Sequence, residues 1–87
     1  MGAVQMSTIP KGLFKLVEEM GELQQVLGKL AAFPDYKHPG DLKLKTALKD
    51  ELADVYAALQ YFVIENGIDL DYSRIDQKIN KFRKWDL

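Results

Sequence analysis

Two long stretches of this 87-residue chain place apolar residues three or four positions apart, which is the spacing of an amphipathic α-helix. The first helix is predicted to begin near Thr8, as an N-cap, and to end at about Leu30. The second is predicted to run from an N-cap at Asp41 to about Asn66, with Gly67 ending it. No segment alternates apolar and polar residues as a strand does. The pattern therefore predicts an all-α fold.

A third and shorter helix is predicted to start after Asp69 or Asp71 and to end at about Trp85. The segment 31–41 contains two prolines and a glycine, so it is predicted to be a loop that reverses the chain. The two long helices would then form an antiparallel hairpin, followed by a short C-terminal arm.

A chain this short needs a source of stability in addition to its own hydrophobic core, such as disulfides or association with another chain. A chain of this size buries only about 60% of the surface that its unfolded form exposes. It contains no cysteine, so disulfides cannot add stability. The second helix has a wide apolar side, from Ala58 round to Val63. We therefore expect one domain over residues 1–87, with 1–7 flexible, completed into a helical bundle by homo-oligomerisation to a homodimer or homotetramer.

The charge of the chain excludes some classes of partner. Twelve Lys and Arg stand against thirteen Asp and Glu, for a net charge of −1, which disfavours binding to nucleic acid through phosphate contacts. No apolar run approaches the roughly 20 residues of a membrane span, and the N-terminus lacks the pattern of a signal peptide. We therefore expect a cytoplasmic protein with no membrane or nucleic-acid partner.

Five carboxylates stand out on the two long helices. Glu19 and Glu22 on the first helix are three residues apart, as are Glu51 and Asp54 on the second, and Glu18 precedes the first pair. Residues at this spacing are neighbours on one side of a helix. If the hairpin is antiparallel, the two acidic pairs can face each other. Mg²⁺ and Mn²⁺ prefer carboxylate oxygens, so this arrangement predicts a site for a hard divalent cation.

Glutamate is also a good helix former, and a single glutamate most often lies on a solvated helix face. Glu51 departs from that pattern because it falls within the apolar stripe of its helix. Its neighbours four residues away are Ala47 and Val55, where a surface glutamate would more often have a lysine. An ionised group on an apolar face needs a compensating cation.

The order and spacing of these acids are similar to a known signature. Glu18-Glu19-x-x-Glu22, then 28 residues, then Glu51-x-x-Asp54 resembles the EExxE…ExxD pattern of the MazG-like all-α nucleoside triphosphate pyrophosphohydrolases. The strings LVEEMGEL and KDELADVYAAL look like the two metal-binding helices of that family, and NKFRKW looks like its basic C-terminal helix. The resemblance covers nearly the whole chain.

The resemblance implies an enzyme that uses Mg²⁺ or Mn²⁺ to cleave a (d)NTP between its α and β phosphates, giving a (d)NMP and pyrophosphate. By spacing, we assign Glu19, Glu22, Glu51 and Asp54 as metal ligands. Glu18 lies outside both pairs and is the candidate for orienting or deprotonating the attacking water.

A triphosphate also needs positive charge beyond the metal. Arg74, Lys78 and Lys81 lie within about 60° of one another around the third helix, with Trp85 in the same row. We expect this row to bind phosphates, and Trp85 or Tyr36 to stack on a base. A basic face near a helix C-terminus is also common simply because it complements the helix dipole.

Two other functions fit the same residues. The first is a phosphoribosyl-ATP pyrophosphohydrolase, which uses a similar helical metal site. The second is a non-catalytic, oligomeric helical interaction module whose acidic face binds a basic partner. Convergence of the five carboxylates on one point would favour metal chemistry, and their dispersal would favour the interaction module.

Overall fold

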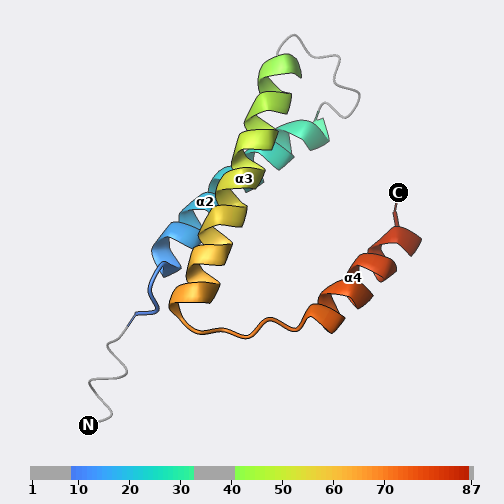
Figure 1. Ribbon diagram of the computed structural model, residues 1–87. Helices are drawn as coiled ribbons and strands as arrows, with labels where there is room; N and C mark the ends of the chain where they lie inside the picture. The colour runs from blue at the N-terminus through green and yellow to red at the C-terminus, as the bar shows by residue number, and fades with distance from the viewer. Residues whose placement is uncertain (1–8, 33–40, 87) are drawn as a thin grey trace.

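A computed structural model describes residues 9–32 and 41–86, which form three α-helices and no strand (Figure 1). The helices are α2 (Leu13–Ala32), α3 (Asp41–Glu65) and α4 (Tyr72–Lys84). The predicted all-α fold is confirmed for this part of the chain. The expectations for residues 1–7, for Thr8 and for Tyr36 lie outside the described residues.

Helix α2 begins at Leu13, five residues later than the predicted start near Thr8. Gly12 explains the difference, because its φ of 84° is a left-handed conformation that a regular helix does not contain. The ring of Tyr61 would lie 2.8 Å from a Cβ atom at position 12, so glycine is also required there for space. The first turn is closed by a hydrogen bond from the Leu13 N–H to the carbonyl oxygen of Pro10.

Helix α3 ends at Glu65, within one residue of the predicted end at about Asn66, and Gly67 caps it as predicted. Gly67 has a φ of 60°, and its N–H donates to the carbonyl oxygen of Ile64. The N–H of Ile68 donates to the carbonyl oxygen of Val63. This pair of bonds is the Schellman motif, which satisfies the last carbonyls of a helix. At its other end, α3 includes Asp41, which was predicted to precede it.

Asn66 joins the end of α3 to the start of α2. Its side-chain Nδ2 donates to the carbonyl oxygens of Lys11 and Phe62, both at 2.8 Å, and its Oδ1 accepts from the Lys11 N–H at 3.2 Å. An ion pair of 3.2 Å between Lys11 and Glu65 lies beside these bonds. These contacts fix the register in which α2 and α3 pack antiparallel (Figure 1).

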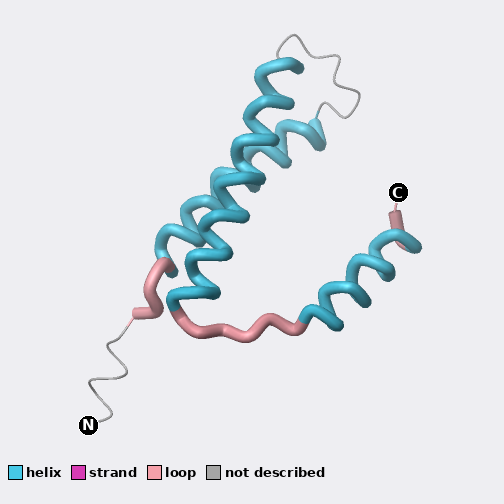
Figure 2. The backbone as a smooth tube through the Cα atoms, in the orientation of Figure 1, coloured by secondary structure: helices cyan, strands magenta, loops and turns pink. Residues whose placement is uncertain are grey.

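Helix α4 lies apart from this hairpin. Its N-cap is Asp71, one of the two predicted starts, whose Oδ1 accepts from the Arg74 N–H at 2.9 Å. A short loop connects it to α3 (Figure 2). Among the described residues, no Cα atom of α4 comes within 8 Å of α2 or α3.

The chain by itself has almost no core. Ala58 is the one buried apolar residue in the part that the structure describes, and large apolar side chains remain exposed on all three helices. The accessible surface is 7440 Å², whereas a compact monomer of this mass exposes about 5,200 Å². The radius of gyration is 17.0 Å, against about 12 Å for a compact chain of this length. No helix in the described ranges is long and apolar enough to cross a membrane.

Candidate metal centre

Three of the predicted ligands meet between the two long helices. Glu19 and Glu22 on α2 and Glu51 on α3 each offer one carboxylate oxygen, and these oxygens all lie within 4.8 Å of one another. The antiparallel packing of α2 on α3 produces this arrangement, because it brings the middle of each helix against the other. Glu19 and Glu51 are half-buried, and Glu22 is exposed.

Two oxygen atoms of this cluster lack the partners that burial normally requires. Glu19 Oε1 and Glu51 Oε2 are buried and accept no hydrogen bond. Only 15% of the Glu19 side chain is exposed. A buried carboxylate oxygen without a partner is unfavourable, and the cost falls if a cation or a proton binds there.

The same environment changes the acidity of these two groups. Burial raises the pKa of the Glu19 carboxyl above its ordinary value, and the negative charges of Glu22 and Asp54 raise it further. Burial is also the main cause of the raised pKa of Glu51, followed by the charges of Glu22, Asp54 and Glu19. The site therefore favours a positive charge among its carboxylates, either a metal ion or protons.

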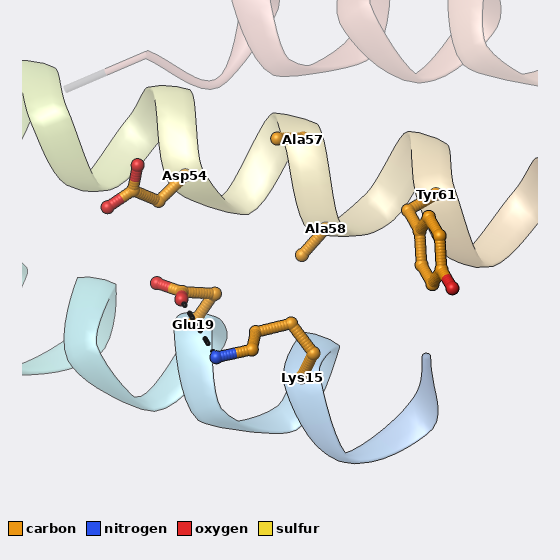
Figure 3. Close-up of a pocket in the computed structure, with 6 residues that line it drawn as sticks. All are labelled: Lys15, Glu19, Asp54, Ala57, Ala58 and Tyr61. Carbon is orange, nitrogen blue, oxygen red and sulfur yellow. Dashed lines mark ion pairs between the residues drawn. The ribbon is translucent and has the colours of Figure 1, made fainter. Parts of the chain in front are cut away.

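Asp54 lies beside the cluster and faces a cavity of about 270 Å³ between α2 and α3. In Figure 3, the carboxylates of Asp54 on α3 and Glu19 on α2 lie across from each other between the two helices. Ala57 and Ala58 lie next to them on α3, and the ring of Tyr61 lies further along that helix. Asp54 is not one of the three residues whose oxygens lie within 4.8 Å, although its charge contributes to the raised pKa of both half-buried glutamates.

Lys15 also lines this cavity, although it is not among the residues predicted to form the site. Its Nζ forms an ion pair with Glu18 Oε1 and lies 4.0 Å from Glu19 Oε2. This ion pairing could have been predicted from the sequence, because Lys15 precedes Glu18 by three residues and Glu19 by four, and residues at these spacings are neighbours on a helix. Glu18 is not one of the three clustered acids, and 54% of its side chain is exposed.

The residues predicted to bind phosphate lie elsewhere in the chain. Arg74 and Lys78 line a shallow cavity on α4 together with apolar side chains of that helix, and Trp85 is its exposed C-cap. Lys81 is also exposed. Among the described residues no Cα atom of α4 lies within 8 Å of α2 or α3, so one chain does not bring these residues to the carboxylates.

Comparison of the chain with protein-family models, with curated proteins and with solved structures finds no match. The fold and the site therefore define this protein as an all-α hairpin with three clustered carboxylates between its helices.

Proposed function

We propose that this chain is a MazG-like nucleoside triphosphate pyrophosphohydrolase of the cytoplasm, which uses Mg²⁺ or Mn²⁺ to convert a (d)NTP into a (d)NMP and pyrophosphate. The observation that carries the proposal is the convergence of Glu19, Glu22 and Glu51, with two buried oxygens that have no partner. These are three of the five positions at which the sequence resembles that family.

The donor atoms fit a hard divalent cation. Every candidate ligand supplies carboxylate oxygen, and the described residues of the cluster include no sulfur or imidazole ligand. Glu19, Glu22 and Glu51 would hold the ion, with Asp54 as the fourth ligand facing the adjoining cavity. A bound Mg²⁺ or Mn²⁺ would polarise phosphoryl oxygens and lower the pKa of a water molecule.

Glu18 has the role of proton acceptor in this proposal. The oxygen of water forms a bond to one phosphorus, and the bond from that same phosphorus to the bridging oxygen breaks. The bridging oxygen leaves with the other phosphate, and the Glu18 carboxylate takes the proton from the water. Glu18 is adjacent to Glu19 in the chain and is not part of the three-oxygen cluster. Its exposed carboxylate pairs with Lys15, which lines the cavity. That position suits a base for water better than a ligand.

The contacts of α4 with substrate belong to the assembled protein in this proposal. Arg74, Lys78, Lys81 and Trp85 are not adjacent to the carboxylates of their own chain. They would reach a nucleotide only in a homodimer or homotetramer.

The direct test is a panel of nucleoside triphosphates, including phosphoribosyl-ATP, incubated with Mg²⁺ or Mn²⁺. We expect pyrophosphate to be released with no orthophosphate, and labelled oxygen from water to appear in the monophosphate or the pyrophosphate. Glu51→Gln serves as the inactive control, because it removes one charge of the cluster without changing the size of the side chain. Release of orthophosphate would contradict the assigned reaction.

Two results would favour the other functions. Turnover of phosphoribosyl-ATP alone would favour the biosynthetic pyrophosphohydrolase. The absence of any turnover, together with unchanged melting in Mg²⁺ and Mn²⁺, would favour the interaction module. The three converging oxygens support metal chemistry over that module, because a surface that only attracts basic partners does not need buried carboxylate oxygens.

A further inference from the structure

The cavity beside the carboxylates has two chemically different ends. Glu19 and Asp54 line one end, and the aromatic ring of Tyr61 lines the other (Figure 3). Ala57 and Ala58 lie between these ends on α3. Among the described residues, Tyr61 is the one aromatic side chain that lines this cavity. The proposed metal site uses the acidic end and leaves the aromatic end without a role.

The helical period of α3 produces this order of side chains. Asp54 and Tyr61 are seven residues apart, which places them about 20° from each other around the helix and about 10.5 Å apart along it. Ala57 and Ala58 lie between them along the axis, each within about 60° of Asp54 around the helix. The methyl groups of the two alanines leave room between the acid and the ring that longer side chains would fill.

The ring of Tyr61 is held in place by the start of α2. A Cβ atom at Gly12 would lie 2.8 Å from Cδ2 and 3.0 Å from Cε2 of the ring, so one side of the ring packs directly against the Gly12 backbone. The neighbouring Lys11 is fixed to α3 by hydrogen bonds of its backbone with Asn66 and by its ion pair with Glu65. Tyr61 is nevertheless 44% exposed. It therefore offers an open aromatic surface that needs little ordering when a ligand binds.

A nucleotide has the same order of parts as this cavity. Its phosphates need the divalent cation that the carboxylates would hold, and its base is a flat ring that stacks on aromatic side chains. The sugar lies between them. The cavity of about 270 Å³ is slightly smaller than the roughly 300–1,000 Å³ of pockets that enclose a whole small ligand. It therefore suits the nucleoside part of a nucleotide, with the triphosphate extending over the carboxylates.

We propose that Tyr61 contacts the nucleobase of the substrate, with the sugar over the two alanines and the phosphates at the acidic end of the cavity. This inference rests on the proposed pyrophosphohydrolase function and assigns its nucleoside subsite. Trp85, one of the two residues that the sequence favours for base stacking, lies on α4, and no described Cα atom of that helix comes within 8 Å of α2 or α3. Tyr61 lies on the same helix face as Asp54, so a single chain supplies both parts of the site.

The test compares Tyr61→Leu with Tyr61→Phe, which keeps the ring, and with Tyr56→Leu. Tyr56→Leu is the matched control, because it makes the same change on α3 about 140° from Tyr61 and does not line the cavity. The substrates are the four common dNTPs with Mn²⁺, and inorganic tripolyphosphate, which lacks sugar and base, is the competing inhibitor. We expect Tyr61→Leu to raise KM for the dNTPs about 10-fold or more while kcat stays near that of the wild type. KM in the other two variants and the inhibition constant of tripolyphosphate in all of them should stay within about two-fold of the wild type.

Three results would overturn the proposal, and they are distinguishable. A wild-type KM for all four dNTPs in Tyr61→Leu would overturn the nucleoside subsite and leave the pyrophosphohydrolase function standing. Equal weakening of dNTPs and tripolyphosphate in Tyr61→Leu would mean that the ring only supports the hairpin. The absence of both turnover and calorimetric binding of the dNTPs in the wild type would overturn the proposed function, and this inference with it.

If Tyr61→Leu fails to fold, as judged by circular dichroism, Ala57→Leu replaces it in the same comparison. Ala57 is exposed, so the larger side chain can be added without disturbing a core, and it fills the space between the acidic end and the ring. We expect this variant to raise KM for the dNTPs and to leave inhibition by tripolyphosphate unchanged. An unchanged KM for the dNTPs would mean that the nucleoside binds elsewhere and would overturn the assignment.

Discussion

The two sides of the α2–α3 hairpin differ in the kind of unsatisfied group that a single chain presents: buried carboxylate oxygens on one side and exposed apolar side chains on the other. On one side, Glu19 and Glu51 have buried oxygens without partners, and a positive charge would complete them. On the other side, Met20 and Leu59 are exposed, and another apolar surface would complete them. The same two helices thus carry an electrostatic requirement and a hydrophobic one, about half a turn apart.

Neighbouring residues in the sequence are divided between these two sides. Glu19 and Met20 are adjacent in the chain but lie about 100° apart around α2. A substitution at one position therefore tests one side of the hairpin and leaves the other nearly unchanged. This separation makes the comparison between the two sides testable.

The largest effect is expected from Glu51→Gln. Loss of this charge should abolish the rise in melting temperature that Mg²⁺ or Mn²⁺ causes, because the ion loses a buried ligand. It should also reduce turnover by more than the roughly 100-fold that loss of a group supporting a metal ligand costs. Without metal, the variant should melt no lower than the wild type at neutral pH, because one repelling charge has gone.

The matched control is Glu65→Gln, which removes a carboxylate from the same helix. Glu65 pairs with Lys11 at the end of α3, away from the cluster. The metal response should be unchanged in this variant. Equal losses in both variants would mean that the total charge of the hairpin matters and the three-oxygen cluster does not.

The second prediction separates the roles within the carboxylate side. Glu18→Gln should retain metal and nucleotide binding while kcat falls by about 10²–10⁴-fold, the range attributed to general acid–base catalysis. Asp54→Asn should instead weaken metal binding and turnover together. Thermal shift with Mn²⁺ and steady-state kinetics on both variants check this. Normal turnover of Glu18→Gln would remove its assigned role.

The third prediction concerns the apolar side. Leu59→Asp should dissociate the assembly and lower its stability by at least about 2 kcal/mol, because it places a charge where an apolar side chain becomes buried. Denaturant unfolding and light scattering measure the two effects. Lys49→Asp, also a new acid at an exposed position of α3, should leave the mass unchanged. A Leu59→Asp protein with wild-type mass would contradict the expected interface.

The sequence predicted the fold where the cause of the structure was local. The end of α3 was correct because Gly67 supplies the left-handed residue of a Schellman motif. The predicted start of α2 was wrong because Gly12 has a φ of 84°, outside the helical region. The ring of Tyr61, 49 residues away, lies beside Gly12, and the sequence does not show that contact. The sequence predicted α4 as a short arm after the hairpin. It could not show what the apolar side of α4 contacts, because its apolar spacing is the same whether its partner is in the same chain or another.

The candidate site follows the same rule. The helical period places Glu19 and Glu22 on one side of α2, and sequence alone shows this. Which residue of α3 comes opposite depends on the register of the hairpin, to which the contacts of Asn66 with Lys11 contribute. The sequence therefore predicted the acidic pairs, but it could not show that Glu51 completes the cluster while Asp54 lies beside it.

The smallest effect is expected from pH in the absence of metal. The pKa values of Glu19 and Glu51 are raised in the folded chain from an ordinary value of 4.5, so between that value and the raised ones the folded state binds more protons than the unfolded state. The free energy of unfolding should therefore rise as the pH falls through the raised pKa values. A carboxylate stabilised by a salt bridge would have the opposite effect, because its contribution is lost as the pH falls. The stabilisation from these two carboxyls reaches its full size below their pKa in the unfolded chain.

Glu51→Gln should flatten this dependence, measured as the difference in melting temperature between about pH 8 and about pH 5. A saturating divalent ion should act in the opposite direction, because it competes with protons for the same oxygens and raises the melting temperature more at the higher pH. Leu59→Ala, on the apolar side, lowers the melting temperature without changing this pH dependence. A wild-type slope that survives in Glu51→Gln would show that the protons bind elsewhere, and the two sides of the hairpin would then not differ in the way inferred from the buried oxygens.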